Sequence, residues 1–204
     1  MPSFLILEWY NKIIKTIVII HGWGGSSKGD WIPWLSSECQ KLGYNVVIPD
    51  MPNTDTPDIG KWVSYLQTIL KTVDENTFFV GHSIGCQTIM RFLAGQDQKA
   101  GGAVFVAGWF TLQNLSSDEE ENGIAKPWLK TPIDFEKVKS VLLKSVAILS
   151  NNDPFVRLAE NKKIFEEKLN SKVVVVPNAG HITADAGFTK MPEILNQLKE
   201  IINS

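Results

Sequence analysis

The stretch TFFVGHSIGCQTIMRFLAG, residues 77–95, changes from strand to helix character around a single serine. Its first four residues are β-branched or aromatic, which is typical of a buried strand. From residue 86 on, apolar residues recur at helical spacing, and Gly95 is placed to end that helix. Ser83 lies between the two elements with Gly81 and Gly85 beside it. The stretch therefore predicts a strand, a tight turn that carries Ser83, and a helix.

Strand-like runs of this kind recur along the whole chain. They are continuously apolar, as parallel strands covered on both faces are. With residues 77–80 the set comprises 16–20, 45–49, 103–107, 145–149 and 172–176.

Amphipathic segments alternate with these runs. We expect helices over residues 31–42, which Gly43 ends, and over 59–70, with Thr56 as N-cap and Pro57 at the first helical position. Two further apolar stripes span 158–169 and 191–202. The alternation predicts an α/β protein, a three-layer α/β/α sandwich with a mostly parallel six-stranded sheet.

Composition indicates one globular domain over residues 1–204, because 204 residues with 44% hydrophobic content can bury one sizeable core. The formal net charge of -2 offers no basic surface for nucleic acid or for a membrane. Residues 1–14 form an N-terminal extension to which the pattern assigns no structure. Glu8 and Lys12 interrupt its apolar run, so we expect no transmembrane helix there. Cys39 and Cys86 fall in predicted helices as small core side chains. We expect a cytoplasmic protein.

The segment from about 108 to 135 breaks the alternation, since it is too long and irregular for a bare connection. Its acidic run, residues 118–121, is typical of a solvated loop tip. Large apolar groups in a loop must pack on something, so we expect a lid or pocket wall. The side chains assigned to that pocket are Trp109, Phe110, Leu115 and Trp128.

The sequence GHSIG, residues 81–85, satisfies the pattern G-x-S-x-G. In that pattern a sharp strand-to-helix turn holds a strained serine with its hydroxyl exposed. Ligands of open α/β sheets bind beyond the carboxyl ends of the strands, where Ser83 is placed. Ser83 is therefore a candidate nucleophile.

A serine needs a base to take its proton, and the base needs a third group to orient it. Of the three histidines, His181 follows the last strand, where a loop can carry it back over the sheet edge. His82 adjoins the serine but points elsewhere across the turn, which favours a structural role. His21 precedes a glycine-rich loop and is expected to orient it. We predict His181 as the base.

Asp153 ends the strand before the histidine strand, which gives the chain order serine, acid, histidine that nucleophile-elbow enzymes use. Asp50, Asp134 and Asp185 remain alternatives, each of which can also be a cap or turn residue. Asp153 itself precedes a proline, which favours turns as well. We predict Asp153 as the acid.

The loop HGWGGSSKG, residues 21–29, has glycines that let backbone N–H groups converge on a developing oxyanion. The amides of Trp23 and Ile84 are the predicted donors. A phosphate-binding turn is the competing interpretation, but Ser27 stands where a dinucleotide site has its third glycine or alanine. The histidines and cysteines show no metal-ligand spacing, so we expect no metal or other cofactor.

These motifs, with WFTLQNL at 109–115, KPWLKTPIDFEKVK at 126–139 and NAGHITADAGF at 178–188, resemble the small serine hydrolases of the retinoblastoma-binding-protein and YdeN-like type. The resemblance runs from about Lys15 to the C-terminus. It implies a compact α/β-hydrolase fold with Ser83, Asp153 and His181 matching the family's triad. Family members act on esters or amides. The Leu-x-Cys-x-Glu motif for retinoblastoma-type pockets is absent, so that partner is not expected.

The sequence thus predicts a serine hydrolase that cleaves carboxyl esters or amides of small to medium apolar substrates through an acyl-enzyme on Ser83. A nucleotide-binding α/β protein and a non-catalytic interaction module that retains the fold are the two alternatives. The pattern names no protein partner.

Overall fold

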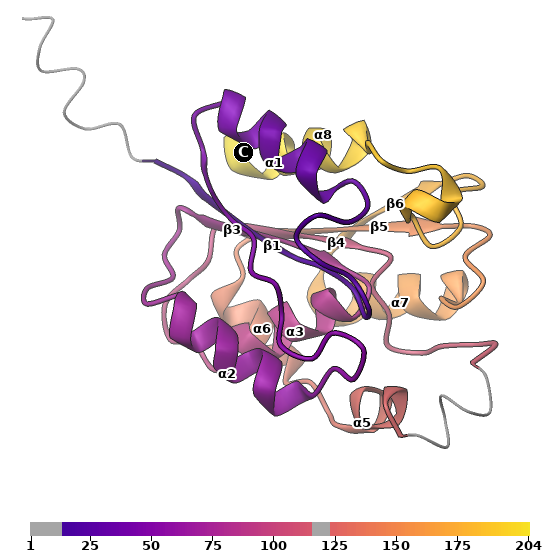
Figure 1. The fold of residues 1–204 in the computed structure, drawn as a ribbon. Helices are drawn as coiled ribbons and strands as arrows, with labels where there is room; N and C mark the ends of the chain where they lie inside the picture. Colours follow the sequence, from indigo (N-terminus) through magenta and orange to yellow (C-terminus); the bar gives the residue numbers. More distant parts are fainter. Residues whose placement is uncertain (1–13, 116–122) are drawn as a thin grey trace, which may run out of the picture.

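The computed structural model describes residues 14–115 and 123–204. Most of the expected N-terminal extension (1–14) and the acidic run at 118–121 lie outside the described residues. Six strands form one sheet in the order β2-β1-β3-β4-β5-β6, and every strand pair in it is parallel (Figure 1). This confirms the predicted three-layer sandwich.

The strands follow the predicted runs closely. β2 ends two residues early, before Pro49, because proline has no N–H to donate to a neighbouring strand. β3 continues to the residue before Ser83. The bounds are β1 Thr16–Ile20, β2 Asn45–Val47, β3 Thr77–His82, β4 Gly102–Val106, β5 Ser145–Ser150 and β6 Lys172–Val176.

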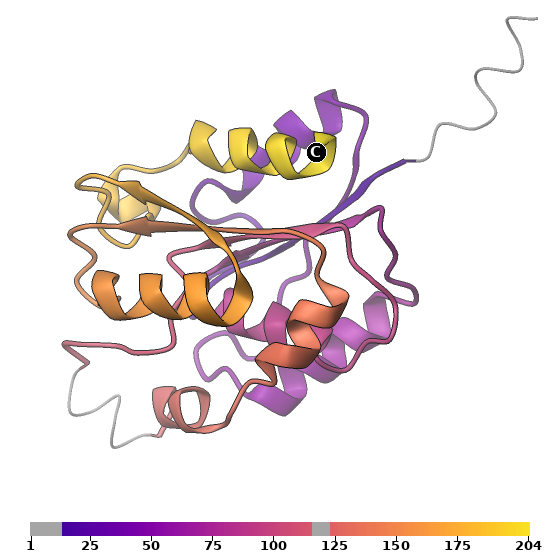
Figure 2. The same cartoon turned by 180° about the vertical axis from the view of Figure 1, so that it is seen from behind.

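Helices cover both faces of the sheet. On one face lie α1 (Ile32–Lys41) and α8 (Pro192–Asn203), and on the other lie α2 (Ile59–Ile69), α3 (Ile84–Leu93), α6 (Phe135–Val141) and α7 (Leu158–Leu169), as the two opposite views show (Figures 1 and 2). The short α5 (Ala125–Lys130) lies outside the α2 and α3 layer. None of the helices in the described ranges is both long and apolar enough to cross a bilayer.

Side chains of the strands alternate between two hydrophobic cores, because successive residues of a strand point to opposite faces. On β1, Ile17 and Ile19 belong to the core under α1 and α8, while Val18 and Ile20 belong to the core under α2 and α3. Trp31 is fully buried in the first of these cores. This two-sided burial is why the strands read as continuously apolar runs.

One helix cap differs from the prediction. The N-cap of α2 is Asp58, whose side chain accepts a hydrogen bond from the Lys61 amide, and not Thr56. Thr56 closes a turn through its own amide, which donates to Asn53. At the start of α6, Asp134 is the N-cap, as the sequence predicted for it.

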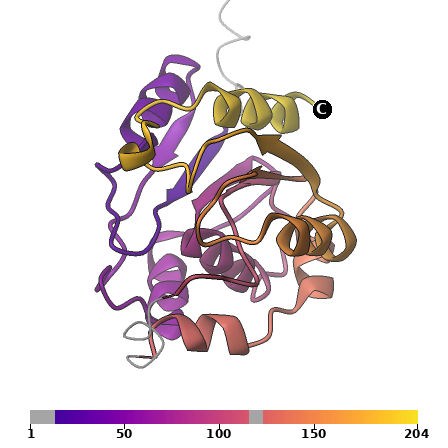
Figure 3. The same cartoon turned by 90° about the vertical axis from the view of Figure 1, so that its right-hand side faces the viewer.

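All six strands run in the same direction, so their carboxyl ends meet at one edge of the sheet (Figure 3). At that edge β3 leads into Ser83, β5 leads into the turn at 151–153, and β6 leads into the loop that carries His181. The parallel topology therefore brings together three segments that lie far apart in the sequence.

Candidate active site

The turn between β3 and α3 places Ser83 in an uncommon backbone conformation, with φ 51° and ψ -120°. Positive φ is costly for a residue with a side chain and persists where the surroundings hold it. Here the Ser83 amide donates to the Val106 carbonyl of β4, and the Ser83 carbonyl accepts from the Cys86 amide, at 2.9 and 3.0 Å. These bonds hold the strand-to-helix turn in place.

The two glycines beside Ser83 are required by close packing. A Cβ at Gly85 would lie 2.5 Å from the Ile20 carbonyl oxygen and 2.7 Å from that of His21. A Cβ at Gly81 would lie 2.8 Å from the Cys86 amide nitrogen. Helix α3 therefore starts directly against β1 and its own strand, a distance that only glycine permits.

Gly85→Ala is expected to lower the free energy of unfolding by about 3 kcal/mol or more, because backbone atoms rather than a flexible side chain would have to move. Denaturant unfolding monitored by circular dichroism measures the loss. Gly95→Ala is the matched control, since its Cβ would meet nothing closer than 3.5 Å. Equal stability of the two variants would contradict the packing argument.

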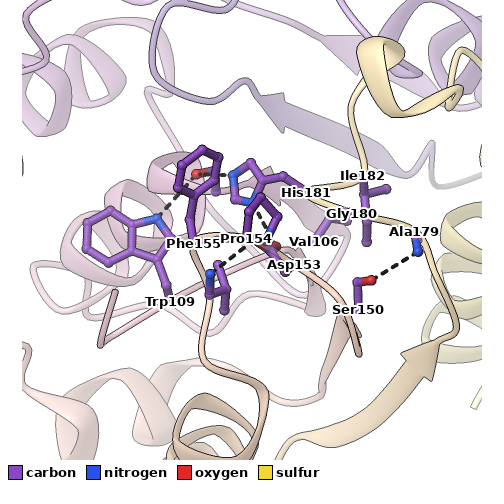
Figure 4. A network of polar contacts seen from close by, with 12 residues as sticks. Val106, Trp109, Ser150, Asp153, Pro154, Phe155, Ala179, Gly180, His181 and Ile182 are labelled. Atoms are coloured by element: carbon purple, nitrogen blue, oxygen red, sulfur yellow. Dashed lines mark hydrogen bonds and ion pairs between the residues drawn. The ribbon is translucent and has the colours of Figure 1, made fainter. Parts of the chain in front are cut away.

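Three polar side chains meet at the carboxyl edge of the sheet (Figure 4). His181 Nε2 lies 2.9 Å from Ser83 Oγ, and His181 Nδ1 lies 2.8 Å from Asp153 Oδ2. A carboxylate can only accept, so Nδ1 carries the proton and Nε2 is left to accept from the serine hydroxyl. The structure therefore brings together the three residues that the sequence singled out.

The carboxylate of Asp153 is fixed on both oxygens. Oδ1 accepts from the amides of Phe155 and Val156, at 2.9 and 3.0 Å, while Oδ2 faces the imidazole. The side chain is only 1% exposed. A turn at Asp153-Pro154 was the alternative explanation for this aspartate. The turn is present, and its amides orient the Asp153 carboxylate toward His181.

The loop that carries His181 is tied to the end of β5. The Ala179 amide donates to Ser150 Oγ (Figure 4). The Gly180 amide donates to Asn152 Oδ1. Ile182, just after the histidine, has a φ of 55°. These polar anchors were not predicted from the sequence, although SNND at 150–153 is a run of residue types that bond to nearby backbone.

The other two histidines have structural contacts. His82 Nε2 donates to the His181 carbonyl at 3.0 Å, and burial, together with the nearby imidazole of His181, lowers the pKa of His82. The ring is therefore neutral, so its 3.9 Å approach to Asp30 is no ion pair. His21 donates to the Gly22 carbonyl and accepts from the Met51 amide, and burial lowers its pKa. His21 thus orients the glycine-rich loop, as expected.

The alternative acids lie elsewhere. Asp50 accepts from the Ser27 amide at 2.6 Å and fixes the same loop. Asp134 caps α6, and Asp185 is exposed in a short 3-10 helix, Ala184–Ala186. Neither Asp50 nor Asp185 is within hydrogen-bond distance of His181 in the described part of the chain.

A cavity of about 390 Å³ opens at Ser83 and His181. The predicted oxyanion donors Trp23 and Ile84 line it, and the structure shows no protein acceptor for either amide among the described residues. Trp109 and Leu115 line it as predicted. The other lining residues are Gly22, Gly24, Gly25, Asp30, His82, Leu112, Phe155 and Thr183.

Two residues assigned to the pocket lie elsewhere. Trp128 is buried, its indole packs edge-on against Trp62, and its N–H donates to the Pro57 carbonyl. Phe110 packs between Phe135 and Phe165. Both side chains pack into the core beneath α2, α3 and α7. They attach the 108–135 segment to that core and do not reach the cavity.

Of the lining residues that the prediction left out, Phe155 contacts the His181 ring edge-on at 5.6 Å. Its position two residues after Asp153 could have indicated from the sequence that Phe155 lies close to the cavity. Within the described ranges, no three His, Cys, Asp or Glu side chains are grouped as ligands for a metal ion. Cys39 and Cys86 are free and buried, as expected.

Comparison with known proteins agrees with this geometry. The sequence model described as serine hydrolase matches residues 17–200. YdeN of Bacillus subtilis, named as a hydrolase, is 31% identical over 190 residues, which are 90% of this chain and 94% of YdeN. The serine hydrolase RBBP9 of Rattus norvegicus is 23% identical over 188 residues, or 91% and 94% of the two chains.

The crystal structure of the Bacillus subtilis ydeN gene product superimposes with a TM-score of 0.84 and 27% sequence identity, covering 93% of this chain and all, 100%, of that one. The fold, the family match and the relatives point the same way. The chain belongs to the serine hydrolase family, has an α/β-hydrolase fold, and is a serine hydrolase.

Proposed function

We propose that the enzyme hydrolyses carboxyl esters or amides of small to medium apolar substrates, with Ser83, His181 and Asp153 as its catalytic triad. The observation that carries the proposal is the unbroken line of hydrogen bonds from Asp153 through His181 to Ser83, which ends in the cavity. Such a line activates a serine without a cofactor.

The reaction follows from these positions. Ser83 Oγ bonds to the substrate carbonyl carbon while its proton passes to His181 Nε2. The carbon–oxygen or carbon–nitrogen bond then breaks, the leaving group takes that proton, and an acyl-enzyme remains. Water attacks the acyl carbon, gives a proton to His181, and frees the acid as Ser83 recovers its proton. Asp153 stabilises the imidazolium at both stages.

The negative charge that develops on the carbonyl oxygen needs donors, and the amides of Trp23 and Ile84 are suited to that role. Both border the cavity next to Ser83. Ile84 is the first residue of α3, where backbone N–H groups have no partner within the helix and the helix dipole favours negative charge. The site therefore offers an oxyanion hole built from the main chain.

The cavity supports an apolar acyl group of limited length. Leu112, Leu115 and Phe155 give it apolar walls, and about 390 Å³ holds a small ligand but no long lipid chain. On p-nitrophenyl esters we expect kcat/KM to rise from acetate to butyrate or hexanoate. Each methylene buried in the cavity contributes about 0.8 kcal/mol, which corresponds to about a fourfold rise. Beyond that length we expect a sharp fall.

Leu115→Ala should move the optimum of kcat/KM to a longer acyl chain, because the smaller side chain enlarges the cavity. Leu143→Ala, which alters an exposed leucine away from the cavity, should leave the profile unchanged. Activity that still climbs at palmitate would contradict an acyl pocket of limited length. Absence of ester and amide turnover by folded protein would contradict the proposed function itself.

We propose a small-molecule substrate and no nucleic-acid partner, on the basis of the charge balance of the chain. We also propose a cytoplasmic location, because both cysteines are free and buried. The nucleotide-binding alternative predicts stoichiometric NAD or ATP binding by calorimetry, and the interaction-module alternative predicts an unreactive Ser83.

A further inference from the structure

The indole of Trp109 contacts the nucleophile itself. Its Nε1 donates to Ser83 Oγ at 3.2 Å, on the oxygen that also faces His181 Nε2 (Figure 4). Since the serine hydroxyl gives its proton to His181, the indole bond uses one lone pair of Oγ. The oxygen is thus held from two directions.

Other tryptophans in the described residues use their indoles differently. Trp23, Trp31, Trp62 and Trp128 each donate to a backbone carbonyl, which is the usual way to satisfy a buried indole. Trp109 is just as buried as Trp128, at 3% against 2% exposure, yet its donor points at a reactive side chain. Burial alone therefore does not explain its orientation.

We propose that Trp109 is a positioning residue that holds Ser83 Oγ in the rotamer facing His181. The inference rests on the proposed function, in which Oγ carries negative charge as its proton leaves. A donor already aimed at Oγ favours that charge, because hydrogen bonds to charged groups are the stronger ones. Once Oγ becomes an ester oxygen it accepts poorly, and the bond is regained when the acyl group departs.

The position of Trp109 is fixed from behind by α3. Gln87 is 1% exposed, and its Nε2 donates to the Trp109 carbonyl at 3.1 Å. One turn later on the same helix, Arg91 Nη2 donates to Gln87 Oε1 at 3.0 Å. The chain before Trp109 also lies against α3, since a Cβ at Gly108 would meet Cys86 Sγ at 3.0 Å.

Arg91 in turn fastens the end of α5. Its guanidinium donates to the carbonyls of Trp128, Thr131 and Pro132, at 3.2, 2.7 and 3.1 Å. Hydrogen bonds therefore connect the α5–α6 linker, through Gln87 and Trp109, to the nucleophile. The main chain from which the Trp109 indole projects is therefore fixed by contacts that do not involve Ser83.

The kinetic test is Trp109→Phe, which removes the N–H and keeps an aromatic ring. We expect kcat on the best p-nitrophenyl ester, and the second-order rate of labelling by a small fluorophosphonate, to fall about 10- to 100-fold with little change in KM. Trp128→Phe is the matched control, because it removes a buried indole donor from the same segment without touching Ser83. Equal activity of the two folded variants would overturn the proposal.

A second measurement needs no activity. In indole ¹⁵N–¹H spectra, with peaks assigned by the two Phe variants, Ser83→Ala should shift the Trp109 proton upfield because its acceptor is gone. The Trp128 peak should stay in place. If Ser83→Ala leaves the Trp109 peak in place, the inference is overturned, even when the wild-type enzyme is active. If Ser83→Ala shifts the peak but the wild-type protein cleaves no ester, only the proposed function is contradicted.

Discussion

Ser83→Ala is expected to lower kcat on p-nitrophenyl esters by about 10⁶ and to abolish labelling by a fluorophosphonate, because it removes the oxygen that forms the acyl-enzyme. Residual turnover from the main-chain donors and the cavity should still exceed that in water. Ester kinetics and intact-protein mass spectrometry measure the two effects. In the wild-type protein, peptide mapping should place one adduct on Ser83.

The control is Ser64→Ala, which changes an exposed serine of α2. It should keep full activity and full labelling. The alanine variant at Ser83 should also unfold at a temperature close to that of the wild type, since alanine bears the same Cβ. A stoichiometric adduct on folded Ser83→Ala protein would show that another residue is the nucleophile.

Asp153→Asn is expected to lower kcat by about 10⁴, as the same change does in a related triad. The two amides of Phe155 and Val156 require an acceptor at the inner position, so the asparagine oxygen must stay there. Its NH₂ group then replaces Oδ2 and donates to His181 Nδ1. The imidazole is left with its proton on Nε2, where it cannot accept from Ser83. Stopped-flow or long-time ester kinetics measure the loss.

Asp50→Asn and Asp185→Asn are the comparison variants, because both aspartates lie away from His181. Each should cost less than about tenfold in kcat. If Asp50→Asn were the more damaging change in folded protein, the assignment of Asp153 as the acid would be wrong.

The regular parts of the fold were predictable because strands covered by helices on both faces are continuously apolar in the sequence. Each strand is a continuous apolar run, and its place in a parallel sheet fixes which end faces the site. The meeting of Ser83, Asp153 and His181 follows from that geometry together with chain order. No long-range detail was needed to choose His181 over His21 and His82.

The irregular segment resisted prediction for a physical reason. Residues 108–135 have no constant period, so the sequence shows that Trp128 and Phe110 are apolar but not which surface they meet. Both fill the core instead of the cavity. The indole of Trp109 donates to Ser83 Oγ and its carbonyl accepts from Gln87, and both partners are set only by tertiary packing.

Capping had a similar limit. Thr56 and Asp58 are both good N-cap types, and the choice between them depends on where the preceding turn ends. The carboxylate of Asp58 reaches the Lys61 amide, while Thr56 is used by that turn.

The anchors between β5 and the loop that carries His181 lie outside the cavity. The loop that carries His181 is held by Ser150 Oγ and Asn152 Oδ1, and neither residue lines the cavity. In the proposed enzyme, Leu115 in the cavity wall can therefore be replaced without removing either of these anchors. On the proposed function, a change at Leu115 alters substrate preference while the loop that carries His181 keeps its position.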